Sequence, residues 1–162
     1  MCAAGVLLPC HAQAVNSEEL LESGNNDFRE SAISAICEDK DKTASTAALV
    51  KALKNSYWPV RYKALLCLGD RAKTDLEAGK ALALFLRMDD GSREKVTAAA
   101  IDAIGKARPT DIAFELSRHM KSPSEMVRKA TAKAMIALED PTALKILTKS
   151  ITETNCEPGP DS

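Results

Sequence analysis

The sequence predicts an all-α fold, a solenoid of about four helix pairs followed by a terminal helix. Three observations lead to this prediction: a helical segment that occurs four times, turn signals between paired helices, and many small apolar residues. Hydrophobic residues make up 45% of the 162 residues, whereas aromatic residues make up only 4%. Such a composition suits closely packed helices better than strands, which favour aromatic and β-branched side chains.

The repeated segment has four copies that align without gaps. They begin at Phe28, Val60, Val96 and Val127, so their starts are 32, 36 and 31 residues apart. In every copy positions 1 and 9 are large and apolar, while positions 5 and 8 are small. This spacing places the four positions on one face of a helix. We expect the small residues, such as Ala64 and Ala103, to set the distance between stacked helices.

A weaker helical pattern precedes three of the copies, over residues 43–55, 75–88 and 110–120. A last helix is predicted to begin at Asp140-Pro141, with Asp as the cap and Pro in the first turn. Thr74 and Glu77 have the spacing of a capping box. Turn signals separate the paired helices at residues 56–59, 89–92 and 121–124.

The copies resemble a known repeat family. The pattern Val60-Arg61-x-x-Ala64-x-x-x-Leu68-Gly69 resembles the second helix of a HEAT repeat, in the short form that phycobilin lyase subunits also contain. Val127-Arg128 repeats the start of this pattern, and Ile104-Gly105 repeats its end. The resemblance extends over about residues 17–152 and implies a right-handed superhelix. The patterns of tetratricopeptide and ankyrin repeats are absent.

In HEAT repeats the second helices line a concave surface that usually holds the partner. The resemblance therefore implies that positions 3, 7 and 11 of each copy face a groove. These positions are Glu30, Ser34 and Glu38; Tyr62, Leu66 and Asp70; Ala98, Asp102 and Lys106; and Lys129, Lys133 and Ala137. The groove would be acidic at one end, apolar at Tyr62 and Leu66, and basic at Lys129 and Lys133. An exposed Tyr beside Leu within a charged rim is typical of a protein interface, although a solvated helix face with one chance apolar pair gives the same pattern.

Other candidate partner-binding residues are Tyr57 and Arg61. Trp58, the only tryptophan, is expected to pack against the adjoining repeat, whereas the role of Tyr57 stays open. Arg61 occupies the same position as Arg29 and Arg128. Such a row could hold an acidic or phosphorylated ligand, but in HEAT arrays this Arg commonly forms a structural ladder with Asp or with backbone carbonyls of neighbouring turns, and we favour the ladder.

Composition and motifs argue against several other functions. The 22 basic and 23 acidic residues nearly cancel, and no basic stripe is evident, so no nucleic-acid partner is predicted. No Gly-rich phosphate loop, H-E-x-x-H or G-x-S-x-G motif occurs. The five cysteines lack metal-binding spacing. We therefore predict no enzyme activity, no metal and no cofactor. No apolar run is long enough to span a membrane.

Residues 1–14 differ from the rest of the chain. They end in Ala12-Gln13-Ala14, which resembles the cleavage site of a signal peptide, but a basic region before it is missing. The segment is therefore either a remnant of a signal peptide, with a periplasmic or secreted protein, or a disordered leader of a cytoplasmic one. Residues 15–152 are predicted to form the repeat domain and 153–162 a disordered tail. Cleavage would leave three cysteines, so we expect Cys37 and Cys67 to be free thiols packed on apolar helix faces.

The leading functional prediction is a non-enzymatic scaffold that binds a protein or peptide on its concave face. A tetrapyrrole chaperone is an alternative that rests only on the resemblance to phycobilin lyases. A HEAT-like DNA-binding module is a further alternative, which the balanced charge disfavours. The sequence does not predict an oligomeric state.

Overall fold

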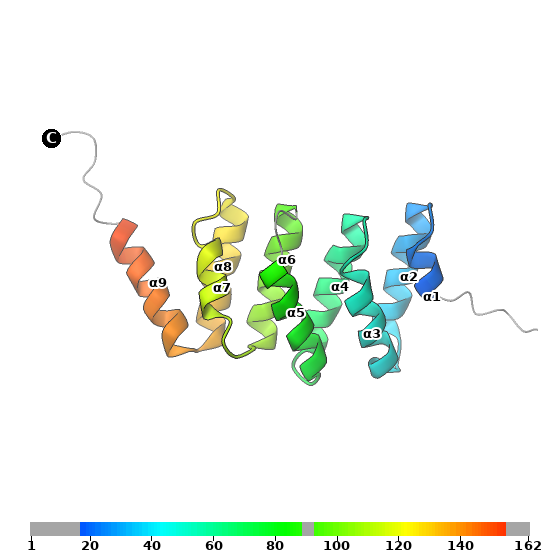
Figure 1. Cartoon of the computed structure of the whole chain (residues 1–162), viewed down its shortest axis with the longest axis horizontal. Coiled ribbons are helices and arrows are strands. Elements are labelled where there is room, and N and C mark those ends of the chain that lie inside the picture. Colours follow the sequence, from blue (N-terminus) through cyan, green and yellow to red (C-terminus); the bar gives the residue numbers. More distant parts are fainter. Residues whose placement is uncertain (1–16, 89–92, 155–162) are drawn as a thin grey trace, which may run out of the picture.

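The computed structural model describes residues 17–88 and 93–154 (Figure 1). Within these residues the chain forms helices and no strands, as the sequence predicts. The helices are α1 (Ser17–Leu21), α2 (Asn26–Glu38), α3 (Lys42–Ala52), α4 (Trp58–Arg71), α5 (Leu76–Met88), α6 (Glu94–Ala107), α7 (Ala113–His119), α8 (Glu125–Leu138) and α9 (Pro141–Thr154). None of these helices is both long and apolar enough to cross a bilayer. The predicted leader at 1–14 lies outside the described residues, as does the chain after residue 154.

The helices stack as pairs into an elongated array of two layers. The first helices of the pairs are α1, α3, α5 and α7, and the second helices, which contain the four sequence copies, are α2, α4, α6 and α8. Each first helix packs against its own second helix, and the second helices pack against one another in chain order. Figure 1 shows this row, with α9 packed against α7 and α8 at one end. The predicted solenoid is confirmed, and it includes a short first helix, α1, that the sequence pattern did not locate.

The second helices approach closely where position 10 of one copy meets position 8 of the next. A Cβ atom added to Gly69 would lie 2.8 Å from the Cβ and 2.9 Å from the Cα of Ala103. A Cβ atom added to Gly105 would lie 3.1 Å from the Cα of Ala134. At Gly69 there is no room for a side chain, so glycine allows the backbones of α4 and α6 to pack directly. Positions 5 and 8 were expected to set the spacing, whereas this contact pairs position 8 with position 10.

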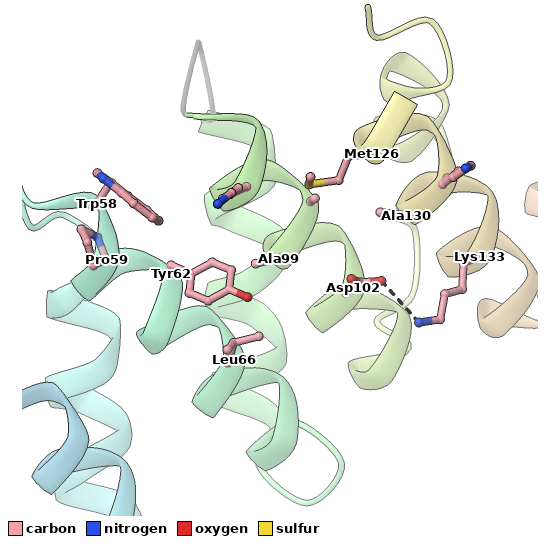
Figure 2. A pocket seen from close by; sticks show the side chains of 12 residues that line it. Trp58, Pro59, Tyr62, Leu66, Ala99, Asp102, Met126, Ala130 and Lys133 are labelled. Carbon is pink, nitrogen blue, oxygen red and sulfur yellow. Dashed lines mark ion pairs between the residues drawn. The ribbon is translucent and has the colours of Figure 1, made fainter. Parts of the chain in front are cut away.

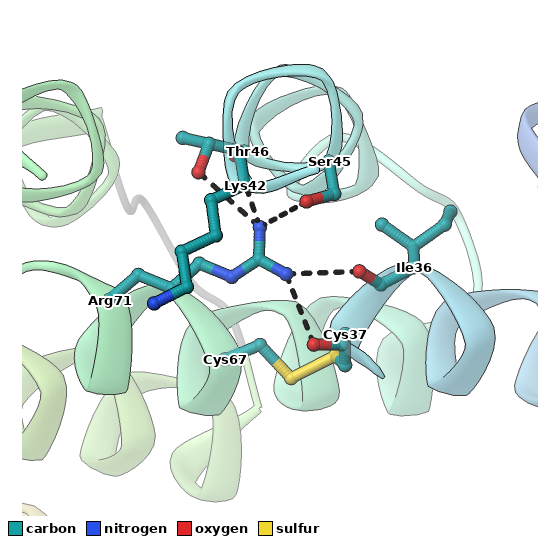
Figure 3. Close-up of a disulfide and its surroundings, with 7 residues drawn as sticks. All are labelled: Ile36, Cys37, Lys42, Ser45, Thr46, Cys67 and Arg71. Atoms are coloured by element: carbon teal, nitrogen blue, oxygen red, sulfur yellow. Dashed lines mark hydrogen bonds between the residues drawn. A yellow bond between two sulfur atoms is a disulfide. The ribbon is translucent and has the colours of Figure 1, made fainter. Parts of the chain in front are cut away.

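Between α2 and α4, a disulfide lies where position 10 of one copy meets position 8 of the next. Cys37 is at position 10 of its copy and Cys67 at position 8 of the next, and their Cα atoms are 5.8 Å apart (Figure 3). The expectation of two free thiols is therefore wrong. Each Cys could be assigned to an apolar face from the helical period, but the period does not reveal which residues of the two faces meet.

Arg71 adds a polar link beside the disulfide (Figure 3). From the end of α4, its Nη2 donates hydrogen bonds to the carbonyl oxygens of Ile36 and Cys37, each at 3.0 Å. Its Nη1 donates to the Ser45 hydroxyl on α3 at 2.6 Å. Because the last carbonyls of a helix have no partner within the helix, the guanidinium satisfies the end of α2 while it joins three helices.

The first copy departs from the predicted burial. Ala35, at position 8, is exposed, and so is Phe28, at position 1. In later copies position 8 is covered by position 10 of the preceding second helix, and within the described residues no second helix precedes α2. The short α1 offers only five residues to cover Phe28. The prediction of one buried face in every copy is wrong at this end of the array.

Asp75, rather than Thr74, caps α5. Its Oδ1 accepts hydrogen bonds from the backbone N–H groups of Glu77 at 3.0 Å and Ala78 at 3.3 Å. Its Oδ2 accepts from the hydroxyl of Thr46 on α3 at 2.8 Å, and this bond is the largest of the effects that lower the pKa of Asp75. The predicted capping box is therefore wrong by one residue. At α9 the cap is as predicted, with the Asp140 side chain accepting from the N–H of Thr142 at 2.6 Å.

We expect Gly69→Ala to lower the free energy of unfolding by about 1–3 kcal/mol, because the added methyl group must displace the backbone of Ala103. Gly79 in α5 is a matched control, since nothing lies within 4 Å of a Cβ atom there. Gly79→Ala should stabilise the protein by about 0.5–1 kcal/mol through helix propensity. Urea unfolding followed by circular dichroism measures both. A Gly69→Ala protein of unchanged stability would contradict the close contact.

Replacing both Cys37 and Cys67 with Ser should lower the free energy of unfolding by about 2–4 kcal/mol, because the bond joins residues 30 positions apart in the chain. A reductant should destabilise the original protein to a similar extent and leave the double variant unaffected, which separates loss of the bond from the effect of serine. Unfolding curves with and without dithiothreitol provide the measurement. If both thiols react with an alkylating agent in protein purified without reductant, the disulfide is refuted.

Candidate functional site

A groove of ≈ 630 Å³ lies on the face formed by the second helices (Figure 2). Three successive second helices contribute four residues each. From α4 these are Trp58, Pro59, Tyr62 and Leu66; from α6, Lys95, Ala98, Ala99 and Asp102; and from α8, Met126, Lys129, Ala130 and Lys133. We refer to this hollow as the groove.

The groove brings together most of the predicted site residues. Tyr62 and Leu66 line one side, and Lys129 and Lys133 line the other, all at positions 3 and 7 of their copies. The surface is narrower than predicted, because no position of the first copy and no position 11 lines it. Asp70 and Lys106, both at position 11, instead form an ion pair of 2.7 Å outside it.

Side-chain size explains why the hollow forms at this place. Ala98, Ala99 and Ala130 are small and buried, so they leave a depression between larger side chains on α4 and α8. Figure 2 shows Tyr62 and Met126 on opposite sides of α6. The HEAT resemblance implied which positions face the groove, but the depth of the surface depends on the sizes of side chains from three helices.

The α4 side of the groove is aromatic. The rings of Trp58 and Tyr62 meet edge to face, with centroids 6.4 Å apart and an interplanar angle of 69°. The Arg93 guanidinium lies 5.6 Å from the centroid of the Trp58 ring, within the range of a cation–π interaction. Trp58 is half-buried and packs against the core, as expected, but it also lines the groove. Tyr62 and Met126 are 36% and 48% exposed, so apolar surface remains open to a partner.

The charged residues of the groove are mainly basic. Lys95, Lys129 and Lys133 line it, with Asp102 as the only acidic residue of the lining. Lys133 is 3.8 Å from Asp102, and Lys129 is 2.6 Å from Glu125 one turn earlier on α8. Both lysines are largely exposed, and exposed ion pairs contribute little. Their ammonium groups therefore remain available to another carboxylate.

Two other predicted site residues, Tyr57 and Arg61, do not line the groove. The Tyr57 hydroxyl donates to Glu30 on α2 at 2.8 Å, and this hydrogen bond raises the pKa of Tyr57. Arg61 donates to the carbonyl oxygens of Asn55 at 2.7 Å and Ser56 at 3.1 Å.

The row of arginines follows one local pattern. Arg128 donates to the carbonyl oxygens of Ser122 at 2.7 Å and Pro123 at 2.8 Å, and Arg29 donates to that of Ser23. Each Arg therefore binds the turn just before its own helix. This supports the structural interpretation, in which the arginines bind backbone carbonyls of neighbouring turns.

A second hollow, of ≈ 730 Å³, lies between the first helices α3 and α5 and was missed in the sequence analysis. Leu76 and Leu84 line it and are 72% and 56% exposed. Its charged residues are balanced: two lysines, Lys42 and Lys80, face Asp75 and Glu77. The helical period of α5 could have revealed this hollow. It places Leu76 and Leu84 on one face of the helix, away from the face that holds the buried Leu82 and Leu86.

Residues 81–157 match the family model for HEAT repeats, a stretch that begins within α5 and extends beyond α9. The chain therefore contains HEAT repeats. The resemblance noted in the sequence is confirmed at this level, while the link to phycobilin lyase subunits stays a prediction. No curated protein matches the chain. Because copies 1 and 2 align with copies 3 and 4 and stack in the same way, the earlier half of this HEAT-repeat protein follows the architecture of the matched half.

The described part of this HEAT-repeat protein, residues 17–88 and 93–154, contains no cluster of three His, Cys, Asp or Glu side chains placed to hold a metal ion. The groove is lined by apolar side chains, lysines and one carboxylate. The chemistry it offers is apolar contact and ionic or hydrogen-bonding interaction.

Proposed function

We propose that this HEAT-repeat protein is a non-enzymatic scaffold that holds a peptide segment of a protein partner in the groove. The observation that carries the proposal is the open apolar surface of Trp58, Tyr62, Leu66 and Met126 across three successive second helices. Tyr and Trp are frequent anchors of protein interfaces. HEAT repeats generally serve as protein-interaction scaffolds, and repeat arrays present extended binding surfaces.

The groove is preorganised for binding. All its lining residues lie in helices, eight of them beyond the first two helical positions, and its floor rests on buried alanines. The same helices are held together by the contacts of Gly69 with Ala103 and of Gly105 with Ala134. A rigid surface lowers the free-energy cost of binding, because fewer of its side chains and loops must become ordered when a partner binds.

The shape of the groove favours an elongated partner. Its walls come from α4 and α8 and its floor from α6, so it follows the direction in which the repeats stack. Sites for small molecules are concave and bury most of the ligand surface, with a few convergent polar groups. In the groove the lysines belong to the exposed outer face of the helices, which suits the polar rim of an interface.

We expect Tyr62→Ala with Leu66→Ala to weaken peptide binding by at least about tenfold, because both changes remove apolar surface from the α4 wall of the groove. The peptides are selected with the unchanged protein from a random display library, and their affinities are measured by fluorescence anisotropy. Circular dichroism should remain unchanged, since Tyr62 is exposed and Leu66 only half-buried.

Leu76→Ala with Leu84→Ala is the matched control, because it removes two exposed apolar side chains from the hollow between α3 and α5. This control should bind the selected peptides as the unchanged protein does. If it loses binding while the Tyr62 and Leu66 variant keeps it, the binding site lies on the first helices and the proposal is wrong.

A further inference from the structure

The groove combines an aromatic wall with an excess of positive charge, and the two lie on different helices. Trp58, Tyr62 and Leu66 are on α4, whereas Lys129 and Lys133 are on α8 (Figure 2). Lys95 on α6 makes no ion pair with any described residue. Three lysines against the single carboxylate of Asp102 leave the lining with a net charge of +2.

This positive charge is local. The whole chain has a formal net charge of −1. On the same helix layer, α2 carries Glu30 and Glu38, both exposed. The field therefore changes sign along the array, and an anionic segment would be attracted to the α6 and α8 part of the groove and repelled from α2.

Resting on the proposed function, we infer that the groove binds an acidic peptide segment with a large apolar side chain. The apolar side chain lies between Tyr62, Leu66 and Met126, and carboxylates of the peptide meet Lys129 and Lys133. Complementarity in charge and apolarity determines the choice of partner.

Asp102 competes with the carboxylates of a bound peptide for Lys133, because the two side chains already form an ion pair. At 3.8 Å it is the longest ion pair among the described residues, and the Lys133 side chain is well exposed. A carboxylate of the peptide can take Lys133 from Asp102, but it must approach a negative charge to do so. Removing that charge should therefore strengthen binding of an acidic peptide, whereas removing the lysines should weaken it.

Single-stranded nucleic acid, the other anionic partner with a use for aromatic residues, fits the groove less well. Stacking of bases needs open ring faces, whereas Arg93 lies over the Trp58 ring and the edge contact engages Trp58 with Tyr62. Leu66 and Met126 are aliphatic, and Asp102 would repel phosphates. These features favour the side chains of a peptide.

The test begins with selection of peptides from the random library at low salt, without bias in composition. The selected peptides should be net acidic and carry at least one large apolar residue. Their affinity should fall by about tenfold or more in Lys129→Glu with Lys133→Glu. It should rise by about two- to fivefold in Asp102→Asn, and it should fall as salt is added.

The matched control is Lys54→Glu with Lys73→Glu, which changes the net charge equally at exposed lysines outside the groove. This control should change affinity by less than about twofold at physiological salt, because charges beyond the Debye length are screened. Thermal unfolding of each variant shows whether the fold is retained; the altered side chains are all exposed or half-buried.

The outcomes separate this inference from the proposed function. If the selected peptides are neutral or basic but still require Tyr62 and Leu66, the charge inference is overturned and the peptide-binding groove stands. If no selected peptide depends on Tyr62 and Leu66, both are overturned. Binding of an oligothymidylate probe that displaces the acidic peptide and is tighter than it would assign the groove to nucleic acid and overturn the inference.

Discussion

The close approach of successive second helices determines much of this structure. At Gly69 and Gly105 one helix presents bare backbone to Ala103 and Ala134 of the next, and a Cβ atom at Gly69 would overlap with Ala103. Such contacts fix the register of one repeat on the next, because a small shift would bring larger neighbouring side chains into the joint. The groove depends on this register, since its lining consists of equivalent positions of α4, α6 and α8.

The contact between α2 and α4 uses a covalent bond and side-chain hydrogen bonds in place of a glycine contact. Cys37 and Cys67 form a covalent bond there, and Arg71 binds the last carbonyls of α2. In a repeat array each unit contacts only its neighbours, so an end unit has fewer stabilising interfaces than an internal one. Among the described residues the α2 pair is such a unit, and the disulfide adds a covalent link to it. Such bonds persist in oxidising compartments and are rare in the cytosol.

The groove arises from a contrast of side-chain size within a regular array. The repeat places the same positions of three helices in a row, and at Ala98 and Ala99 the middle side chains are small enough to leave a hollow. The neighbouring copies supply an aromatic wall at Tyr62 and basic groups at Lys133. A regular scaffold can thus carry a specific surface, because the residues that fix the stacking are separate from those that face the groove.

The sequence by itself determined the four second helices, three of the first helices and the last helix, because helical periodicity is a local property. The HEAT resemblance added the expectation that Tyr62, Leu66, Lys129 and Lys133 face a groove. Only the tertiary structure decided which residues meet across helices. The disulfide, the Gly69 contact and the hollow between α3 and α5 join residues about thirty positions apart. Their pairing depends on the relative shift and rotation of two helices, which packing sets and which the period of either helix does not contain.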